Sequence, residues 1–303
     1  MKKHESNAGM YAVVVWFNPD IDTVTYWNAM AKWVSLVVVD NTEAHRKIYN
    51  AGDVPNAVRY ISCDQNQGIA AALNLGLQAG SDKSVFGDHI PAWCLQFDQD
   101  SRVDQVFLQD MKRATNIALP TTAAIAPCYY DTNVERIAPV IEASFFHLRK
   151  KPPVGDAPIL ASYVISSGCM INLKAAEVIG LHDESLFIDF VDIEWGLRAT
   201  HLGYRIWVLP KVLMTHCLGD NPVQIGATKL PNHSPLRHYY YFRNVFLMAR
   251  KPFVPAAWKV IEFVKLPVRF AVYALYTKCK KQQIKSMLKG TWHGVLGVKG
   301  KQH

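Results

Sequence analysis

The sequence lacks any apolar run long enough to cross a bilayer. A membrane-spanning helix needs about 20 consecutive apolar residues, whereas the longest early run, residues 11–17, stops at Asn18 and Pro19. The charged start, Met-Lys-Lys-His-Glu, is followed by no adequate apolar segment or small-residue cleavage site of the kind that marks a secretory signal. We therefore expect the protein to remain in the cytoplasm.

Closely spaced cysteines are also missing. The wide separation of the cysteines in the sequence argues against the paired zinc ligands and the disulfide framework that clustered cysteines would indicate. Most of the cysteines have apolar neighbours, which is typical of small core residues in a reducing compartment. The six positions are Cys63, Cys94, Cys128, Cys169, Cys217 and Cys279.

Acidic residues are scarce near the end of the chain. From Arg250 onward there are twelve Lys and Arg but one acid, Glu262, a net charge of +11. The preceding 249 residues carry 21 basic and 24 acidic side chains, a net charge of −3. The overall charge of +8 therefore belongs to the last segment, and the basicity does not indicate a nucleic-acid-binding protein.

The first 100 residues alternate between short apolar runs and amphipathic stretches. Residues 11–16, 36–39, 58–62 and 93–97 are predicted strands, and residues 21–32 and 69–79 are predicted helices. Gly76 lies on the apolar stripe of the second helix, where it would admit a close packing partner. This order predicts an α/β fold of Rossmann type.

The later part of the chain is less regular. Prolines interrupt residues 120–165, so we expect no long element there. Further on we predict strands at residues 161–165, 169–172 and 205–209, and helices at residues 174–179 and 192–202.

Two carboxylates follow the last strand of the first half. In extended geometry residues i and i+2 point the same way, so Asp98 and Asp100 can face one site. Hard oxygen ligands at the carboxyl end of a strand suit Mg²⁺ or Mn²⁺, which bridges a nucleotide diphosphate. A solvated turn that happens to contain two acids is the alternative.

Three more acids precede and open a predicted helix. Asp189, Asp192 and Glu194 stand among bulky apolar residues. A carboxylate in such surroundings can act as a general base, although acids at a helix start are also favoured as caps. Glu194 and Arg198 are spaced to pair on the helix surface.

In combination, these motifs resemble those of family-2 glycosyltransferases, and most closely the bacterial rhamnosyltransferases of O-antigen and related polysaccharides. The resemblance covers about residues 10–250 and depends on the order and spacing of the whole set. The matching motifs are Trp16-Phe17-Asn18-Pro19, Val39-Asp40-Asn41, Asn66-Gln67-Gly68, Phe97-Asp98-Gln99-Asp100-Ser101, Ser166-Ser167-Gly168 and Phe190-Val191-Asp192-Ile193-Glu194.

The resemblance implies a GT-A fold and a set of roles. Asp192 would be the catalytic base and Asp100 a metal ligand. Asp40 would bind the nucleobase, and Asp98 would lie near the ribose or sugar of the donor. The nucleotide pocket would also include Phe17, Asn18, Asn66 and Gly68.

Some assignments have competitors. Many relatives have Glu-Asp where this chain has Val191-Asp192, so Asp189 and Glu194 remain alternatives for the base. His216 follows a predicted strand, where GT-A enzymes often place a third metal ligand, but a hydrogen-bonded core histidine fits equally well. The run from Arg237 to Asn244 is characteristic of the rhamnosyltransferase-like group, and we expect Arg243 to meet a diphosphate.

The segment from residue 251 to 303 is predicted to be a helical extension of a catalytic domain spanning residues 1–250. Apolar bulk beside a face formed by Lys259, Glu262, Lys265 and Arg269 favours an anionic membrane surface, with Pro267 kinking or dividing the helix. A helix packed on the catalytic domain, or a pair used for homodimerisation, is the alternative.

The sequence thus predicts a metal-dependent, inverting rhamnosyltransferase. It would move L-rhamnose from dTDP-L-rhamnose to a lipid-linked saccharide during O-antigen (lipopolysaccharide) synthesis, peripherally on the inner face of the cell membrane. A UDP- or dTDP-hexose donor, or an inactive GT-A scaffold in an assembly complex, are the rival hypotheses.

Overall fold

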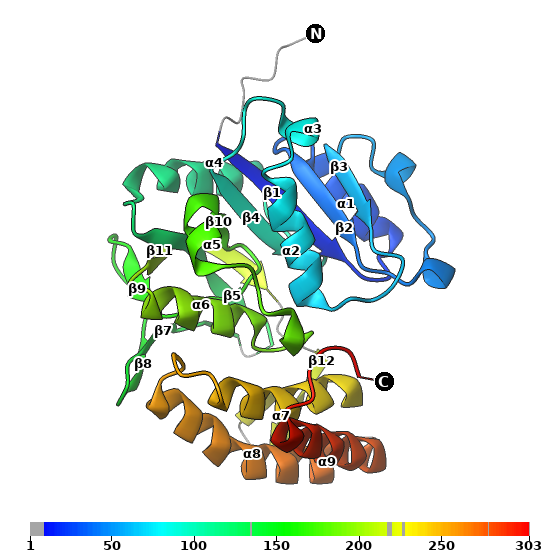
Figure 1. Ribbon diagram of the computed structural model, residues 1–303, viewed down its shortest axis with the longest axis vertical. Helices are drawn as coiled ribbons and strands as arrows, with labels where there is room; N and C mark the ends of the chain where they lie inside the picture. The colour runs from blue at the N-terminus through cyan, green and yellow to red at the C-terminus, as the bar shows by residue number, and fades with distance from the viewer. Residues whose placement is uncertain (1–8, 134, 217–219, 226–227, 278, 303) are drawn as a thin grey trace.

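The computed structural model describes residues 9–133, 135–216, 220–225, 228–277 and 279–302. A mixed sheet lies between two layers of helices, and a separate group of helices packs beside this sandwich (Figure 1). The sheet order is β3-β2-β1-β4-β10-β5-β11-β9, with β6 paired to β5. Its strands are β1 Met10–Trp16, β2 Leu36–Asp40, β3 Arg59–Ser62, β4 Trp93–Asp98, β5 Thr122–Asp131, β6 Arg136–Ile137, β9 Ile159–Ala161, β10 Met170–Asn172 and β11 Arg205–His216.

The first half is a parallel sheet, as predicted. β3, β2, β1 and β4 run in one direction, β10 runs against its neighbours β4 and β5, and β11 is parallel to β5. Two antiparallel hairpins lie outside this sheet, β7 Val140–Ala143 with β8 Leu148–Lys151, and β12 Asp220–Ile225 with β13 Thr228–Asn232. All residues of β1 and β2 are buried, which explains their continuous apolar sequence.

Alternate residues of β1 serve two separate cores. Tyr11, Val13 and Val15 pack against α2, α5 and α6. The residues between them pack against α1 and α4. The sandwich helices are α1 Ile21–Met30, α2 Ile69–Ala79, α3 Lys83–Phe86, α4 Gln105–Ala114, α5 Leu173–Ile179 and α6 Val191–His201.

The close contact expected at Gly76 is confirmed. A Cβ atom at this position of α2 would lie 2.3 Å from Cγ1 of Val13 on β1. Glycine therefore lets this helix approach the sheet where any other residue would force the two apart.

The expectation of no long element in residues 120–165 is wrong, because ten-residue β5 runs through the middle of the sheet. Pro127 lies within this strand and has no N–H to donate to a neighbouring strand, so the sequence argues against a strand here. The sheet accommodates this proline through an irregularity in β11, where the pairing shifts between Leu209 and Leu213. The strand expected at residues 161–165 is also wrong, since β9 ends at Ala161.

A third core joins the C-terminal helices to the sandwich. The helices α7 Pro235–Ala249, α8 Ala256–Tyr276 and α9 Lys280–Leu296 bury Tyr241, Trp258 and Met287 together with Leu186 and Phe190, which precede α6. Ser234 caps α7 by accepting from the backbone N–H of Arg237, and Pro235 occupies the first turn. α7 therefore shares a core with α8 and α9 across the domain boundary that we predicted at residue 250.

The polar face predicted for α8 points inward. Tyr241 donates to Glu262 at 2.5 Å, Lys265 pairs with the same carboxylate at 2.6 Å, and the guanidinium of Arg269 lies 4.3 Å from the Tyr241 ring centroid. α8 also continues through Pro267, so of the two effects predicted for this proline, a kink or a division of the helix, the division is wrong. The outer face of α8 is apolar, with Val260, Val264, Val268 and Leu275 all about 60% exposed. In the part of the chain that the structure describes, no helix combines the length and apolarity needed to span a membrane.

Candidate active site

Three parallel strands bring polar loops to one edge of the sheet. β2 and β4 flank β1, so that Trp16 is paired with Asp40 and Val15 with Asp98. The following loops are tied together by hydrogen bonds from Phe17 N to Gln99 Oε1 at 2.7 Å and from Asn18 N to Thr42 Oγ1 at 2.8 Å. This is the edge at which open α/β sheets bind ligands.

Asp40 lies at the bottom of a pocket on this edge. Its buried carboxylate accepts from Thr42 N at 2.9 Å and from the Tyr60 hydroxyl at 2.5 Å. The cavity has a volume of about 220 Å³. Cationic and aromatic groups meet at its rim, where the Arg46 guanidinium lies 5.9 Å from the ring centroid of Phe17. The lining residues are Asn18, Pro19, Asp40, Thr42, Arg46, Lys47, Ile48 and Tyr49.

The loop before α2 joins this pocket to the loop before α6. Asn41 donates to Asn66 Oδ1 at 3.2 Å and to Gly68 O at 3.3 Å. Gly68 has φ 88° and ψ 163°, a conformation that is essentially restricted to glycine. A Cβ atom there would lie 2.5 Å from the carbonyl oxygen of Phe187, which accepts from Ile69 N. Gly68 therefore provides close backbone contact between two loops of the site.

The two acids after β4 differ in exposure. Asp98 is half-buried and Asp100 is exposed, while Gln99 between them is held by Phe17 N and by Trp27 Nε1. Asp98 is near enough to Asp192 for its charge to help raise the pKa of that carboxyl group. Asp98 therefore lies at the same site as the acid at the start of α6.

The described residues include no group of three or more His, Cys, Asp and Glu side chains placed to hold a metal. The side chain of His216, the expected third ligand, lies outside the described residues. Its backbone ends β11, paired with Asp131 of β5. Asp98 and Asp100 fit a hard divalent ion as oxygen donors at the end of a strand.

Asp192 is the second residue of α6 and is half-buried. Its Oδ1 accepts from Ile193 N at 2.8 Å. Burial raises the pKa of Asp192 to about 6, and the charges of Asp98 and Asp189 add to this effect. A carboxylate with this pKa is ionised at neutral pH and is more basic than an exposed one, as a general base requires.

The two competitors of Asp192 are engaged in ion pairs. Asp189 Oδ1 lies 3.0 Å from Arg237 Nε. Glu194 is buried and pairs with Arg198 at 2.9 Å and Lys251 at 3.1 Å. Because Glu194 joins α6 to the C-terminal helices, the geometry favours Asp192 as the base.

The expectation that Arg243 meets a diphosphate is corrected by its position. Its side chain is fully buried, and all three guanidinium nitrogens donate to protein oxygens. Nη2 contacts the carbonyls of Ser185 and Leu186 at 3.2 and 2.8 Å, Nη1 contacts Gly300 O at 2.5 Å, and Nε contacts Asn244 Oδ1 at 2.9 Å. Four of its five N–H groups therefore bind protein oxygens, and burial keeps this side chain away from a ligand at the surface.

Comparisons with known proteins agree with this geometry. The dTDP-rhamnosyl transferase RfbF of Shigella flexneri is 32% identical over 302 residues, covering 97% of this chain and 98% of that protein. The chain belongs to the rhamnosyltransferase family. No protein-family model matches the sequence.

The fold of this rhamnosyltransferase is that of the GT-A glycosyltransferases. S. aureus TarS 1–349 in complex with UDP-GlcNAc superposes with a TM-score of 0.57 at 14% identity, covering 96% of this chain and 81% of that chain. GalNAc-T7 with UDP, GalNAc and Mn²⁺ gives a TM-score of 0.55 at 11% identity over 90% of this chain. The present chain spans 58% of the GalNAc-T7 chain.

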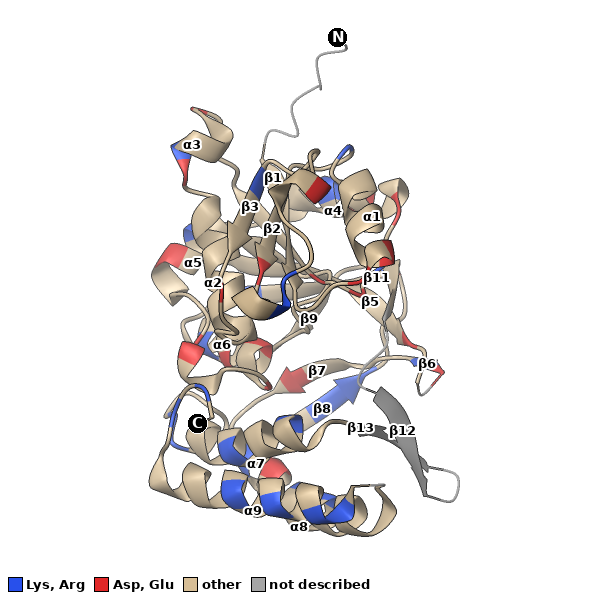
Figure 2. Cartoon of the chain, turned by 90° about the vertical axis from the view of Figure 1, so that its right-hand side faces the viewer, with Lys and Arg blue, Asp and Glu red and all other residues tan. Residues whose placement is uncertain are grey.

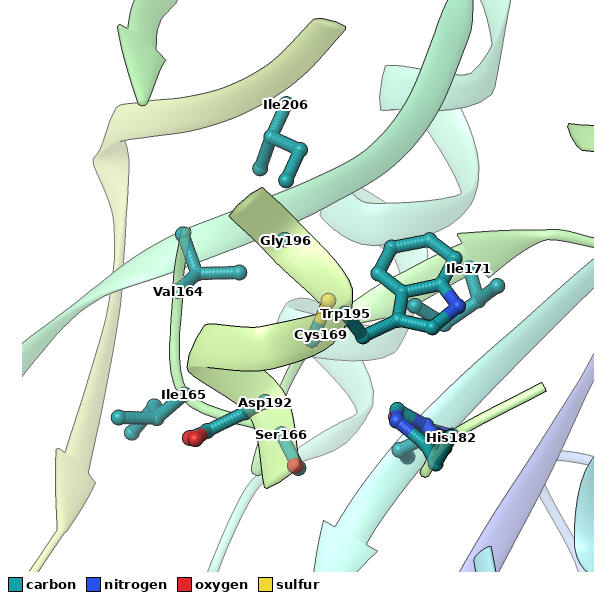
Figure 3. Close-up of a pocket in the computed structure, with 11 residues that line it drawn as sticks. Val164, Ile165, Ser166, Cys169, Ile171, His182, Asp192, Trp195, Gly196 and Ile206 are labelled. Carbon is teal, nitrogen blue, oxygen red and sulfur yellow. Dashed lines mark hydrogen bonds between the residues drawn. The ribbon is translucent and has the colours of Figure 1, made fainter. Parts of the chain in front are cut away.

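In this glycosyltransferase, Asp192 lies near Asp98 and also lines an apolar groove. The groove has a volume of about 200 Å³ and lies beside β5, β7 and the loop before β10. Tyr129, Ile141 and Tyr163 form part of its wall. A smaller cavity behind Asp192, with a volume of about 10 Å³, is bordered by Ser166, Cys169 and His182 (Figure 3). Asp192 thus lies between Asp98 at the strand ends and the apolar groove.

Sequence reasoning missed Arg237 in the site of this rhamnosyltransferase. Its side chain is 41% exposed and pairs with Asp189. Burial works against its charge, yet the carboxylates of Asp189, Asp98 and Asp192 together raise the pKa of Arg237. Arg237 lies six residues before Arg243, in the same run from Arg237 to Asn244. Its place in this run was the signal in the sequence that could have identified it.

Proposed function

We propose that this glycosyltransferase transfers L-rhamnose from dTDP-L-rhamnose to a saccharide acceptor, with inversion at the anomeric carbon. The observation that carries the proposal is Asp192, a base with a raised pKa between the strand-end site and the apolar groove. The relationship to a protein named as a dTDP-rhamnosyl transferase supports the choice of donor.

The donor nucleotide would bind along the edge formed by β1, β2 and β4. Asp40 would accept a hydrogen bond from the nucleobase, and the Phe17 ring and the Asn66–Gly68 loop would line the pocket. The Arg237 guanidinium, close to Asp98 and Asp192, would bind the diphosphate in the role that we had expected for Arg243.

A divalent ion, Mg²⁺ or Mn²⁺, would be held by Asp98 and Asp100, with His216 as a third ligand. The presence of Mn²⁺ with UDP in the GalNAc-T7 structure supports this proposal. When bound, the ion would offset the negative charge on the departing diphosphate. Asp100→Ala should therefore weaken donor binding in the presence of metal, and should have no effect if binding is insensitive to a chelator.

The acceptor hydroxyl would approach from the groove beside Tyr129 and Tyr163. Asp192 would remove its proton as the hydroxyl oxygen forms a bond to the anomeric carbon. The bond from that carbon to the diphosphate oxygen would break on the opposite face, so the configuration inverts and dTDP leaves with the electron pair.

The proposed acceptor is lipid-linked, and the enzyme would work at an anionic membrane surface. We define the outer face as Val260, Val264, Val268 and Leu275 of α8 with Lys281, Lys285, Leu288 and Trp292 of α9, all exposed. Figure 2 shows basic residues along the C-terminal helices, and no acidic residue follows Glu262 in the sequence. Apolar side chains beside lysines suit the boundary between headgroups and acyl chains. This agrees with O-antigen assembly on the inner face of the membrane.

Point substitutions test the membrane proposal without disturbing the core that α8 shares with α7. Val264→Glu with Val268→Glu should reduce sedimentation with vesicles containing anionic phosphatidylglycerol. Val178→Glu, at a 67% exposed position on α5, is the matched control. Equal sedimentation of wild type and the double variant would remove the membrane role, and a dimer that dissociates in the double variant would assign the face to homodimerisation.

The donor is tested by saturation-transfer NMR with dTDP-rhamnose, UDP-glucose, UDP-galactose and UDP-GlcNAc, each with and without Mg²⁺ or Mn²⁺. Selective, metal-dependent binding of dTDP-rhamnose supports the proposal. Binding of a UDP-sugar or another dTDP-hexose instead would retain the mechanism and replace the donor. If no donor bound, the chain would act as an inactive scaffold.

A further inference from the structure

The loop that precedes the proposed base has an unusual backbone. Phe187 has φ 65° and ψ −62°, and Ile188 N donates to Leu186 O at 2.8 Å, which together define a strained γ-turn. Asp189 and Phe190 follow, both with φ 66°. Three non-glycine residues with positive φ in four positions cost free energy that other contacts must offset. We call residues 185–190 the base loop, because they lead directly into α6 and Asp192.

Neighbouring side chains of α7 hold the base loop. Arg243 donates to the carbonyls of Ser185 and Leu186. Asn244 Nδ2 lies 3.0, 2.8 and 3.0 Å from the carbonyls of Leu186, Ile188 and Asp189. These contacts provide hydrogen-bond donors for the carbonyl groups of this irregular backbone.

The turn is also packed from the side of α7. The Tyr240 ring stacks on Phe187 with centroids 4.8 Å apart and an angle of 15° between the planes. The Arg243 guanidinium lies 4.7 Å from the Tyr240 ring centroid. The conformation of the base loop is therefore set by three side chains of one helix, two of them polar and one aromatic.

A segment at the other end of the sequence completes this arrangement. Residues 297–302, here called the terminal segment, leave α9 and return to the base loop near the start of α7 (Figure 1). Gly300 N donates to Ser185 O at 2.8 Å, and Gly300 O accepts from Arg243. Gln302 N donates to the Tyr240 hydroxyl at 2.8 Å. The terminal segment thus contacts the base loop and two of the α7 side chains that hold it.

The terminal segment also reaches the opposite side of the site. Lys301 Nζ lies 3.8 Å from Glu43 Oε1, in the loop that follows Asp40, Asn41 and Thr42. This ion pair is partly exposed and contributes little stability by itself. Because of this ion pair, the terminal segment contacts both the loop after Asp40 and the base loop.

From these contacts we propose that the terminal segment is a positioning element of the active site, which acts through Arg243 and Tyr240 to hold the base loop and so to aim Asp192. This inference depends on the proposed glycosyl transfer, because it concerns the same base. A region that the sequence marks only as a basic extension would thereby take part in setting the rate of the chemical step.

Two variants test this role. The first ends the chain after Lys299, which removes Gly300 and Gln302 but keeps the turn at Gly297 that caps α9. The second is Gly300→Pro, which removes the N–H donor and is incompatible with the φ of 76° at this position. Lys299→Ala is the matched control, since its exposed side chain lies in the same segment. All are assayed with a soluble acceptor, so that membrane binding has no influence.

We expect kcat to fall at least tenfold in both variants, with donor KM within about twofold of wild type and Lys299→Ala unchanged. The pH at which kcat/KM reaches half its maximum should also move, because displacement of the loop changes the burial of Asp192. Arg243→Lys should retain part of the activity, since lysine keeps one donor to the loop but loses the planar fork.

Unchanged kcat and pH profile in both variants would overturn the inference, as would an equal loss of kcat and donor binding that follows a loss of folded protein by circular dichroism. These outcomes are distinguishable from failure of the proposed function. If the proposed function were wrong, the wild-type enzyme itself would transfer no sugar from any donor tested.

Discussion

The two sides of the proposed site, the nucleotide side around Asp40 and Asp98 and the base side around Asp192, are built in different ways. The nucleotide side uses the ends of three regular parallel strands, where register alone places Asp40 and Asp98 on either side of β1. The base side uses a loop with three positive-φ residues, held by Arg243 and Asn244 from a helix more than 50 positions later. Regular hydrogen bonding therefore fixes one half of the site and tertiary contacts fix the other.

This difference has an energetic consequence. Strand ends gain their stability from the apolar core beneath them, so their polar groups can change without unfolding the sheet. The base loop instead stores strain, which persists only while its neighbours determine its conformation. Substitutions on the nucleotide side should act mainly on donor binding, and those on the base side on kcat and stability together.

The largest effect should come from Asp192→Asn. We expect kcat to fall about a thousandfold or more, within the range that loss of a general base produces, with donor affinity largely retained. Fluorescence-monitored binding together with initial rates would separate the two. Normal turnover in this variant would exclude Asp192 as the base and direct attention to Asp189.

Asp192→Asn should also be more stable to unfolding than the wild-type protein near neutral pH. A folded-state pKa of about 6, raised from 3.8, means that the protonated carboxyl stabilises the fold below about pH 4 and that this contribution is lost as the pH rises through 6. At pH 7.5 the charged form costs up to about 3 kcal/mol, a value given by 1.36 kcal/mol per pKa unit. Thermal unfolding of Asp192→Asn at pH 7.5 and pH 4 should show stabilisation at the higher pH alone.

The next largest effect should be seen in the pH profile of the wild-type enzyme. Because a carboxylate base must be ionised, kcat/KM should fall about tenfold per pH unit below about 6 and level off above it. Rates from pH 4.5 to 8, with dTDP-rhamnose below saturation, would provide the profile. A break near pH 4 would indicate an exposed carboxylate and contradict the role assigned to the buried environment of Asp192.

The position of the acids at the strand ends could be predicted from sequence to a large extent. The strands that end in Asp40 and Asp98 are short apolar runs, and the regular geometry of parallel strands then places the two acids at the same edge of the sheet, on either side of β1. The prediction of α2 and its close contact at Gly76 succeeded for the same reason, since helical periodicity is a local property.

The base side could not be predicted to the same extent. Arg237 and Arg243 lie six residues apart on α7, or about 240° around the helix at 100° per residue. Sequence shows that they face different ways but not which of them faces the site. That depends on how α7 packs against the base loop, and the strained φ values of Phe187 and Phe190 leave no mark in the sequence. The predicted polar face of α8 was oriented wrongly relative to solvent for the same reason.

A smaller effect, confined to the contact between the two sides, should follow from Gly68→Ala. The added Cβ would meet Phe187 O and would require a backbone conformation that costs about 1–3 kcal/mol. We expect lower thermal stability and a roughly tenfold lower kcat per folded molecule. Gly76→Ala is the matched control, since its Cβ clashes with Val13 of β1 and not with the base loop, and should lower stability alone. Equal kcat in the two variants would show that the contact does not position the base.

The smallest effect should come from Tyr60→Phe on the nucleotide side. This change removes the hydroxyl that donates to Asp40, so the carboxylate loses one of its two hydrogen bonds from the protein. Without this hydrogen bond Asp40 is less well oriented, and a loss of about 1 kcal/mol in binding free energy would weaken donor binding roughly fivefold. We expect kcat to stay unchanged. Tyr26→Phe, which loses a hydroxyl bonded to Val103 O, should cost stability without affecting donor affinity. A fall in kcat for Tyr60→Phe would mean that the strand-end side also positions the reacting groups, and the contrast between the two halves of the site would then disappear.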